Sequence, residues 1–124
     1  DSPKLFSILG DLWYSRQNYE RTIKAYKKAL TLLPDSPQVL NNLAWLYATC
    51  EDERYRNPKQ AIAFAKRAAA LSESPHVLDT LAESHYVNGQ FEEAISASKH
   101  ALDMAKKNRG DYEKQLGKFI EGSK

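Results

Sequence analysis

Histidine, cysteine and paired carboxylates are the side chains of this 124-residue sequence that could do chemistry, and their spacing favours no reaction. The histidines are His76, His85 and His100, and no two stand four apart, as a metal-binding pair on one helix face would. The lone Cys50 excludes a disulfide framework and a cysteine-based metal site within the chain. The sequence also has no glycine-rich phosphate loop. It therefore predicts a protein that is not an enzyme and needs no metal or cofactor.

Charge and hydropathy exclude two classes of partner. The net charge is +2, and basic pairs such as Lys27-Lys28 alternate with acids, so no basic face for nucleic acid is expected. No apolar run approaches the roughly 18 residues that a membrane-spanning helix needs, so no direct membrane insertion is expected. Apolar residues make up 42% of the chain and charged ones 27%, as in a globular domain. A lone cysteine fits a reducing, cytoplasmic compartment.

Any functional side chain must be positioned by a two-part unit that occurs three times. The first part opens with Ser-Pro and reaches Leu-Gly or Leu-Ala six residues beyond the proline: SPKLFSILGDLWYS (2–15), SPQVLNNLAWLYAT (36–49) and SPHVLDTLAESHYV (74–87). The second part shares an isoleucine and a later alanine: YERTIKAYKKALTLLP (19–34), PKQAIAFAKRAAALSE (58–73) and FEEAISASKHALDMAK (91–106). Apolar residues three and four apart predict a helix for each part. Serine before proline suits a helix start. The pattern predicts six helices in three antiparallel hairpins.

Small residues indicate how the two helices of a hairpin pack. They recur at one place in each first helix and one place in each second helix: Gly10, Ala44 and Ala82, facing Thr22, Ala61 and Ala94. Small side chains allow two helices to approach closely. Thr22 is the bulkiest of the set, and we expect it to open the first hairpin slightly.

This two-helix unit resembles the tetratricopeptide repeat (TPR). The spacing from Pro3 to Pro37 is 34 residues, as that family requires. The first copy carries the family pattern most fully, at Phe6, Leu9, Gly10, Trp13, Tyr19, Tyr26, Ala29 and Pro34. The resemblance implies an all-α, right-handed superhelix in which first helices line a concave groove and second helices form the convex back. We expect one domain over 1–124, with repeats at 3–36, 37–74 and 75–107.

The polar stretch CEDERYRNPKQ (50–60) interrupts the second repeat. Ala44 and Ala61 are 17 residues apart, whereas Gly10 and Thr22 are 12 apart, so five residues are inserted between the two helices. We interpret the stretch as an enlarged surface turn without a function of its own, followed by a helix that Asn57 caps. The variant resembles repeats of large bacterial multi-repeat proteins.

Residues 111–121 predict a terminal capping helix and not a fourth repeat. Tyr112, Leu116, Phe119 and Ile120 fall on one helical stripe. Repeat arrays need such an element to cover the last apolar face and to present a polar one to water.

The predicted groove is aromatic, amide-bearing and acidic. It comprises the first-helix side chains that do not pack within their own hairpin: Ser7, Asp11, Tyr14, Gln38, Asn41, Asn42, Trp45, His76, Asp79, Glu83 and Tyr86. Some TPR domains clamp a partner's C-terminal carboxylate with basic residues and asparagines. Only Asn42 matches that pattern, because Ser7, Thr80 and His76 replace the basic residues. A basic or aromatic partner segment therefore suits the groove better.

The sequence thus predicts a protein–protein interaction module. Two alternatives stay open: homotypic assembly into a dimer or filament, and an accessory role in a larger bacterial enzyme or membrane protein. Residue 1 falls at the edge of a repeat, so we expect the chain to be part of a longer protein.

Overall fold

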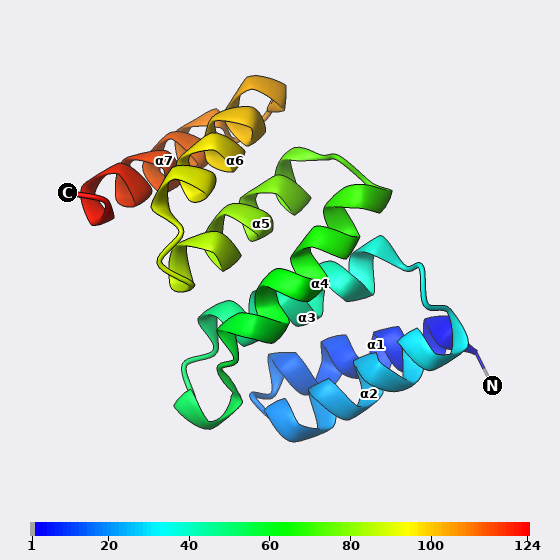
Figure 1. Ribbon diagram of the computed structural model, residues 1–124. Coiled ribbons are helices and arrows are strands. Elements are labelled where there is room, and N and C mark those ends of the chain that lie inside the picture. Colours follow the sequence, from blue (N-terminus) through cyan, green and yellow to red (C-terminus); the bar gives the residue numbers. More distant parts are fainter. Residues whose placement is uncertain (1) are drawn as a thin grey trace.

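The computed structural model describes residues 2–124, which form seven α-helices, one short 3₁₀ helix and no strand. The helices are α1 (Pro3–Ser15), α2 (Tyr19–Leu32), α3 (Pro37–Thr49), η1 (Glu53–Tyr55), α4 (Pro58–Leu71), α5 (Pro75–Val87), α6 (Phe91–Met104) and α7 (Arg109–Gly122). Consecutive helices pair as the antiparallel hairpins α1/α2, α3/α4 and α5/α6, which follow one another along the array (Figure 1). The predicted all-α solenoid of three hairpins with a terminal capping helix is confirmed.

Serine fixes the start of each first helix. The hydroxyl oxygens of Ser2, Ser36 and Ser74 each accept a hydrogen bond, at 3.3 Å, from the backbone N–H three residues on. Proline occupies the first turn of all three helices, where no N–H donor is needed. The three first helices therefore begin in the same register, and equivalent side chains face the same way.

Small side chains lie at the hairpin interfaces, as predicted. Ala44, Ala61, Ala82 and Ala94 are fully buried. Thr22 is also fully buried, and its hydroxyl donates to the carbonyl of Asn18 at 2.8 Å, which satisfies its polar atom inside the hairpin.

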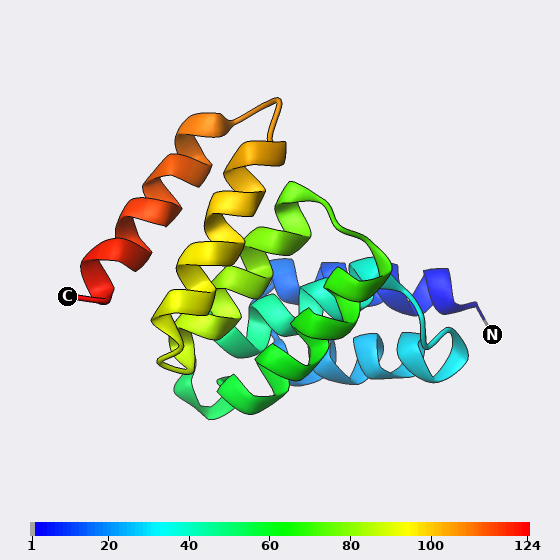
Figure 2. The ribbon, with the colours of Figure 1, turned by 45° about the horizontal axis from the view of Figure 1, so that its top comes forward.

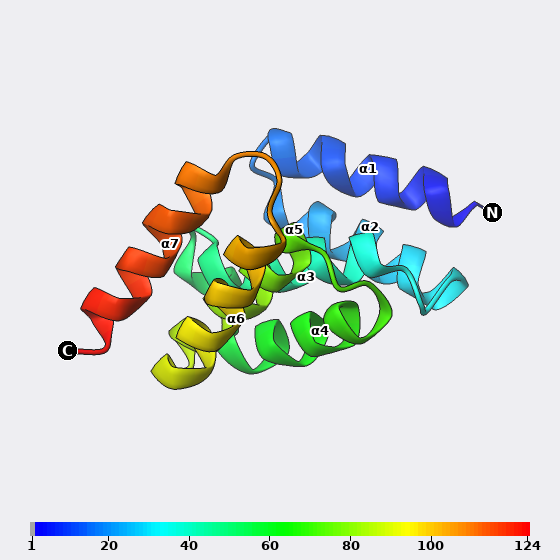
Figure 3. The ribbon, with the colours of Figure 1, turned by 90° about the horizontal axis from the view of Figure 1, so that it is seen from above.

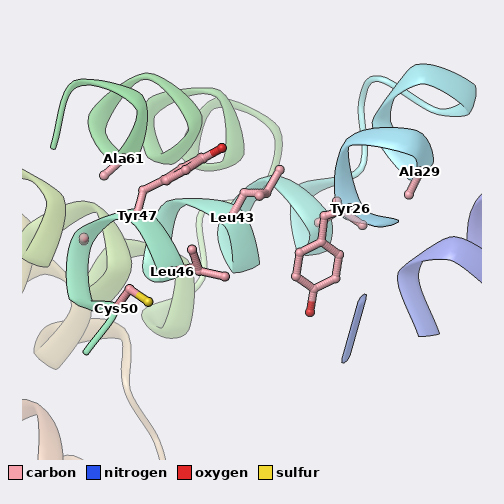
Figure 4. Close-up of a cluster of buried hydrophobic side chains, with 9 residues drawn as sticks. Tyr26, Ala29, Leu43, Leu46, Tyr47, Cys50 and Ala61 are labelled. Atoms are coloured by element: carbon pink, nitrogen blue, oxygen red, sulfur yellow. The ribbon is translucent and has the colours of Figure 1, made fainter. Parts of the chain in front are cut away.

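The core between the first two units is drawn in Figure 4. Tyr26 and Ala29 from α2 pack with Leu43, Leu46 and Tyr47 from α3. The Tyr47 ring extends toward α4, where it stacks with Phe64 at a centroid distance of 6.1 Å and an interplanar angle of 13°. This core fixes the first unit on the second and so sets the distance between α1 and α3.

Helix α7 lies beside α6, at the end of the array away from α1 (Figure 2). Its anchor is Phe119, which is fully buried and packs with Ala82, Ala94 and Tyr86. The helix begins at Arg109, two residues before the predicted start, and ends at Gly122, one residue after the predicted end.

At the other end of the array, the outer helix α1 leaves apolar side chains exposed. Figure 3 shows α1 and α7 as the two outer helices, with α3 and α5 between them. On α1, Leu5, Ile8 and Leu12 are 52%, 53% and 40% exposed. The residues equivalent to Leu5 and Leu12 in α3, Val39 and Leu46, are buried against the preceding unit. The first hairpin (α1 and α2) packs on α3 and buries these positions. Within residues 2–124, no preceding hairpin packs on α1 in the same way.

Candidate functional site

A pocket of about 430 Å³ lies where α1, α3 and α5 face one another. It brings together most of the side chains predicted for the groove. Its lining is Asp11, Tyr14, Tyr26, Asn41, Asn42, Trp45, His76, Asp79 and Thr80. We call this the central pocket. The shared register of the first helices contributes to it, because Asp11 of α1 and Trp45 of α3 occupy equivalent positions, as do Asn41 of α3 and Asp79 of α5.

Tyr26 is a wall of the central pocket that sequence reasoning missed. Its ring is buried in the core, but its hydroxyl reaches the pocket and donates a hydrogen bond to Asp11 Oδ1. The Nδ2 group of Asn42 donates to the same hydroxyl at 3.5 Å. Burial, followed by the hydrogen bond to Asp11, raises the pKa of Tyr26 well above its ordinary value, so the phenol stays neutral and continues to donate.

An amide–imidazole pair joins α3 to α5. Asn41 is only 2% exposed, and its Nδ2 lies 3.0 Å from Nε2 of His76. Its Oδ1 is buried and has no hydrogen-bond partner within residues 2–124. A buried acceptor without a donor is costly, so this atom is a candidate contact for a ligand.

Two carboxylates face the central pocket without a cation. Asp11 and Asp79 form no ion pair with any residue of the described range 2–124. Asp79 accepts one hydrogen bond, from Gln115 Nε2 of α7 at 3.3 Å. Desolvation, helped by the nearby Glu83 charge, raises the pKa of Asp79 despite that bond. The charges of His76 and Lys118 lie near Asp79 and lower its pKa by less than burial raises it, so the pocket has two carboxylates and neither forms an ion pair within residues 2–124.

Four predicted groove residues lie outside the central pocket. Ser7 and Gln38 line a separate hollow beside the α2–α3 connection. Glu83 is buried and pairs with Lys118 of α7, with 2.5 Å between Oε1 and Nζ. Tyr86 packs against Phe91 and Phe119. Helix α7 therefore covers the α5 end of the predicted groove, which the repeat pattern alone did not reveal.

The inserted stretch (residues 50–60) is structured and connects units one and two through contacts with Tyr19. We call it the brace. Glu51 Oε1 accepts a hydrogen bond from the Tyr19 hydroxyl at 2.9 Å, and the Tyr55 ring lies 6.0 Å from the Tyr19 ring. Asn57 caps α4 as predicted, through Oδ1 and the Gln60 N–H at 3.2 Å. Cys50 is buried, and burial raises the pKa of its thiol, which keeps it protonated and structural.

The hydrogen bond between Tyr19 and Glu51 should make the stability of the protein depend on pH. The hydrogen bond to Glu51, with smaller effects of desolvation and of the Glu51 charge, raises the pKa of Tyr19 from 10.0 to about 12. The folded state favours the neutral phenol, so this contribution to stability is complete below pH 10 and is lost as the pH rises to about 12. Glu51→Gln should return the Tyr19 pKa toward 10.0.

This titration is measurable from the ¹³Cζ signals of labelled tyrosines, with Tyr19→Phe to assign the resonance. Glu53→Gln is the control, because Glu53 lies in the same brace and contacts Arg56 instead of Tyr19. A Tyr19 pKa that Glu51→Gln leaves unchanged would contradict the brace geometry.

Two features of residues 2–124 bear on the class of protein. No group of three or more His, Cys, Asp or Glu side chains is arranged to hold a metal ion. No helix in that range is both long and apolar enough to cross a membrane. Nδ1 of His85 lies 2.8 Å from Oε1 of Gln90, at hydrogen-bonding distance.

Comparison with known proteins supports the repeat assignment. A family model described as "TPR repeat" matches residues 10–49. The solved structures that match include the crystal structure of MamA protein, with a TM-score of 0.79 and 22% sequence identity. The match covers 96% of this chain, which spans 62% of the MamA chain. At this identity the likeness shows the fold alone. No curated protein matches the sequence.

Proposed function

Because the chain is a TPR-like helical-repeat protein, a fold that generally serves as a scaffold for protein interactions, we propose that its concave face binds a segment of a partner protein. The central pocket is the centre of that face, and it does no covalent chemistry. The partner segment is basic or aromatic.

One observation carries this proposal. Side chains from three helices meet in one pocket that combines the exposed ring of Tyr14 and the half-buried ring of Trp45 with the carboxylates of Asp11 and Asp79. Aromatic residues beside a partly enclosed pocket are typical of binding hot spots. The two acids disfavour a carboxylate ligand and favour a basic one.

The pocket is also preorganised. Tyr26 holds the Asp11 carboxylate, and His76 holds the Asn41 amide, before any ligand arrives. A partner segment then loses conformational entropy on binding, while the repeat domain loses little. This is the mechanism we propose for recognition.

The test is a peptide-display selection on the domain and on a Tyr14→Ala/Trp45→Ala variant. We expect enrichment of basic or aromatic peptides, and a loss of affinity of about 30-fold or more in the variant, as for a hot spot worth about 2 kcal/mol. Leu32→Ala/Leu71→Ala is the control, since it truncates two exposed apolar side chains outside the pocket. Enriched peptides that bind the aromatic variant as tightly as the wild type would contradict the proposal.

Homotypic assembly is a second candidate, favoured by the uncovered Leu5, Ile8 and Leu12 of α1. These side chains form an apolar stripe on an outer helix, where another helical unit could pack. A display selection that enriches no peptide would favour this candidate.

A further inference from the structure

Three acceptor atoms on residues that line the central pocket have no hydrogen-bond partner within residues 2–124. Asp11 and Asp79 each have Oδ1 engaged, by Tyr26 and Gln115, and no hydrogen bond formed within residues 2–124 uses either Oδ2. The third free acceptor is the buried Oδ1 of Asn41. These acceptors belong to residues of α1, α5 and α3 that line the pocket, so three helices contribute to it.

The walls between these acceptors are aromatic. Tyr14, Tyr26 and Trp45 line the same pocket, and Tyr14 is 39% exposed. A cation placed over such rings gains electrostatic attraction in addition to its pairing with the carboxylates. The lining contains no lysine or arginine, and its aromatic rings and unpaired acceptors suit a positively charged, flat group.

From these acceptors and walls, we infer that the central pocket holds the guanidinium group of an arginine side chain from the partner segment. The inference rests on the proposed function, because the arginine belongs to that segment. Guanidinium presents five N–H donors in one plane and so reaches acceptors on three helices at once. A lysine ammonium is a compact, strongly hydrated charge that stacks less well on a ring. An uncharged aromatic side chain would leave both carboxylates desolvated and unpaired.

The chain already uses the same chemistry at two other places. Lys118 of α7 pairs with Glu83 of α5 while its Nζ lies 5.4 Å from the centroid of the Tyr86 ring. Arg21 places its guanidinium carbon 4.6 Å from the centroid of the Trp13 ring. The central pocket has the acid and the ring of the first arrangement and lacks only the cation.

The test uses N-acetyl-arginine amide as the probe, with the N-acetyl amides of lysine and citrulline as comparisons. Citrulline keeps the planar shape of arginine without the charge. The two indole N–H signals report the site: Trp45 lines the pocket, whereas Trp13 lies outside it and serves as an internal control. We expect the arginine probe to shift the Trp45 signal, to leave Trp13 unchanged, and to bind about tenfold or more tightly than citrulline.

Carboxylate variants complete the test. Asp11→Asn and Asp79→Asn keep an oxygen for Tyr26 and Gln115, so the fold is preserved while one charge is lost. Each should weaken the arginine probe by about tenfold. Asp103→Asn, an exposed acid on α6 outside the pocket, should have no effect. An unmoved Trp45 signal, or equal affinity for citrulline or lysine, would overturn the inference.

The outcomes separate this inference from the proposed function. If peptides selected by display need Trp45 but tolerate citrulline in place of every arginine, the binding groove stands and the arginine assignment fails. If the arginine probe binds as expected and no peptide is enriched, the chemistry of the pocket stands and the role in holding a partner segment fails.

Discussion

Replacing Phe119 with alanine is expected to destabilise the protein by about 3–5 kcal/mol, the usual cost of emptying a fully buried phenylalanine site. Phe119 is the one residue of α7 that is buried, and it packs with Ala82, Ala94 and Tyr86. Helix α7 has little intrinsic stability to offset the loss, because it contains Gly110, Gly117 and Gly122. We expect α7 to detach and to expose the last hairpin.

Urea unfolding monitored by circular dichroism measures this loss, and hydrogen exchange of the α7 amides shows whether the helix detaches. The matched control is Ile120→Ala, at the next position of the same helix. Ile120 is 38% exposed, so its truncation should cost only about 1 kcal/mol. Equal losses for the two variants would show that Phe119 is not the anchor.

Gly10→Ala is expected to destabilise the protein in spite of alanine's higher helix propensity. A Cβ atom at Gly10 would collide with the Tyr26 ring, which is buried and tied through its hydroxyl to Asp11. Overpacking of this kind costs about 1–3 kcal/mol. That exceeds the gain of about 1 kcal/mol from replacing a helical glycine.

Gly117→Ala is the control, because nothing lies within 4 Å of the Cβ position at that residue. It should raise the free energy of unfolding by up to about 1 kcal/mol. The two substitutions are chemically identical and should have opposite signs in thermal and urea unfolding. A Gly10→Ala protein as stable as the wild type would mean that the Tyr26 ring can move freely. In that case Tyr26 would not hold Asp11 in place at the central pocket.

The repeat pattern predicted the fold well because each helix carries its own local signals. Ser-Pro pairs mark the helix starts, and small residues such as Ala44 and Ala61 mark the interfaces; both lie where the structure has them. The groove was predicted from the same register, and most of its predicted residues, including Asp11, Trp45 and Asp79, line the central pocket.

The position of α7, the role of the Tyr26 hydroxyl and the contacts of the inserted stretch could not be predicted, because they depend on contacts outside the repeat pattern. The position of α7 follows from Phe119 and from the close approach of Gly122 to the Tyr86 ring, so the pairing of Glu83 with Lys118 had no signal in the first three units. Tyr26 matched the family's core position, and this concealed the second role of its hydroxyl. The inserted stretch was predicted to be a plain turn because its contacts leave no local signal. Tyr55 and Glu51 contact Tyr19, which is more than thirty residues away in the sequence.

The uncovered stripe of Leu5, Ile8 and Leu12 has a consequence for how the molecule comes apart. In a linear array, each unit is stabilised by its own packing and by its neighbours, so a unit with one neighbour melts before a unit with two. Within residues 2–124, the first hairpin has a neighbour on one side only, whereas α7 covers the third. Fraying should therefore start at α1, which supplies Asp11 and Tyr14 to the pocket. A ligand that bridges Asp11 and Asp79 would bind only while the first hairpin is folded. It would therefore stabilise that hairpin and delay its unfolding.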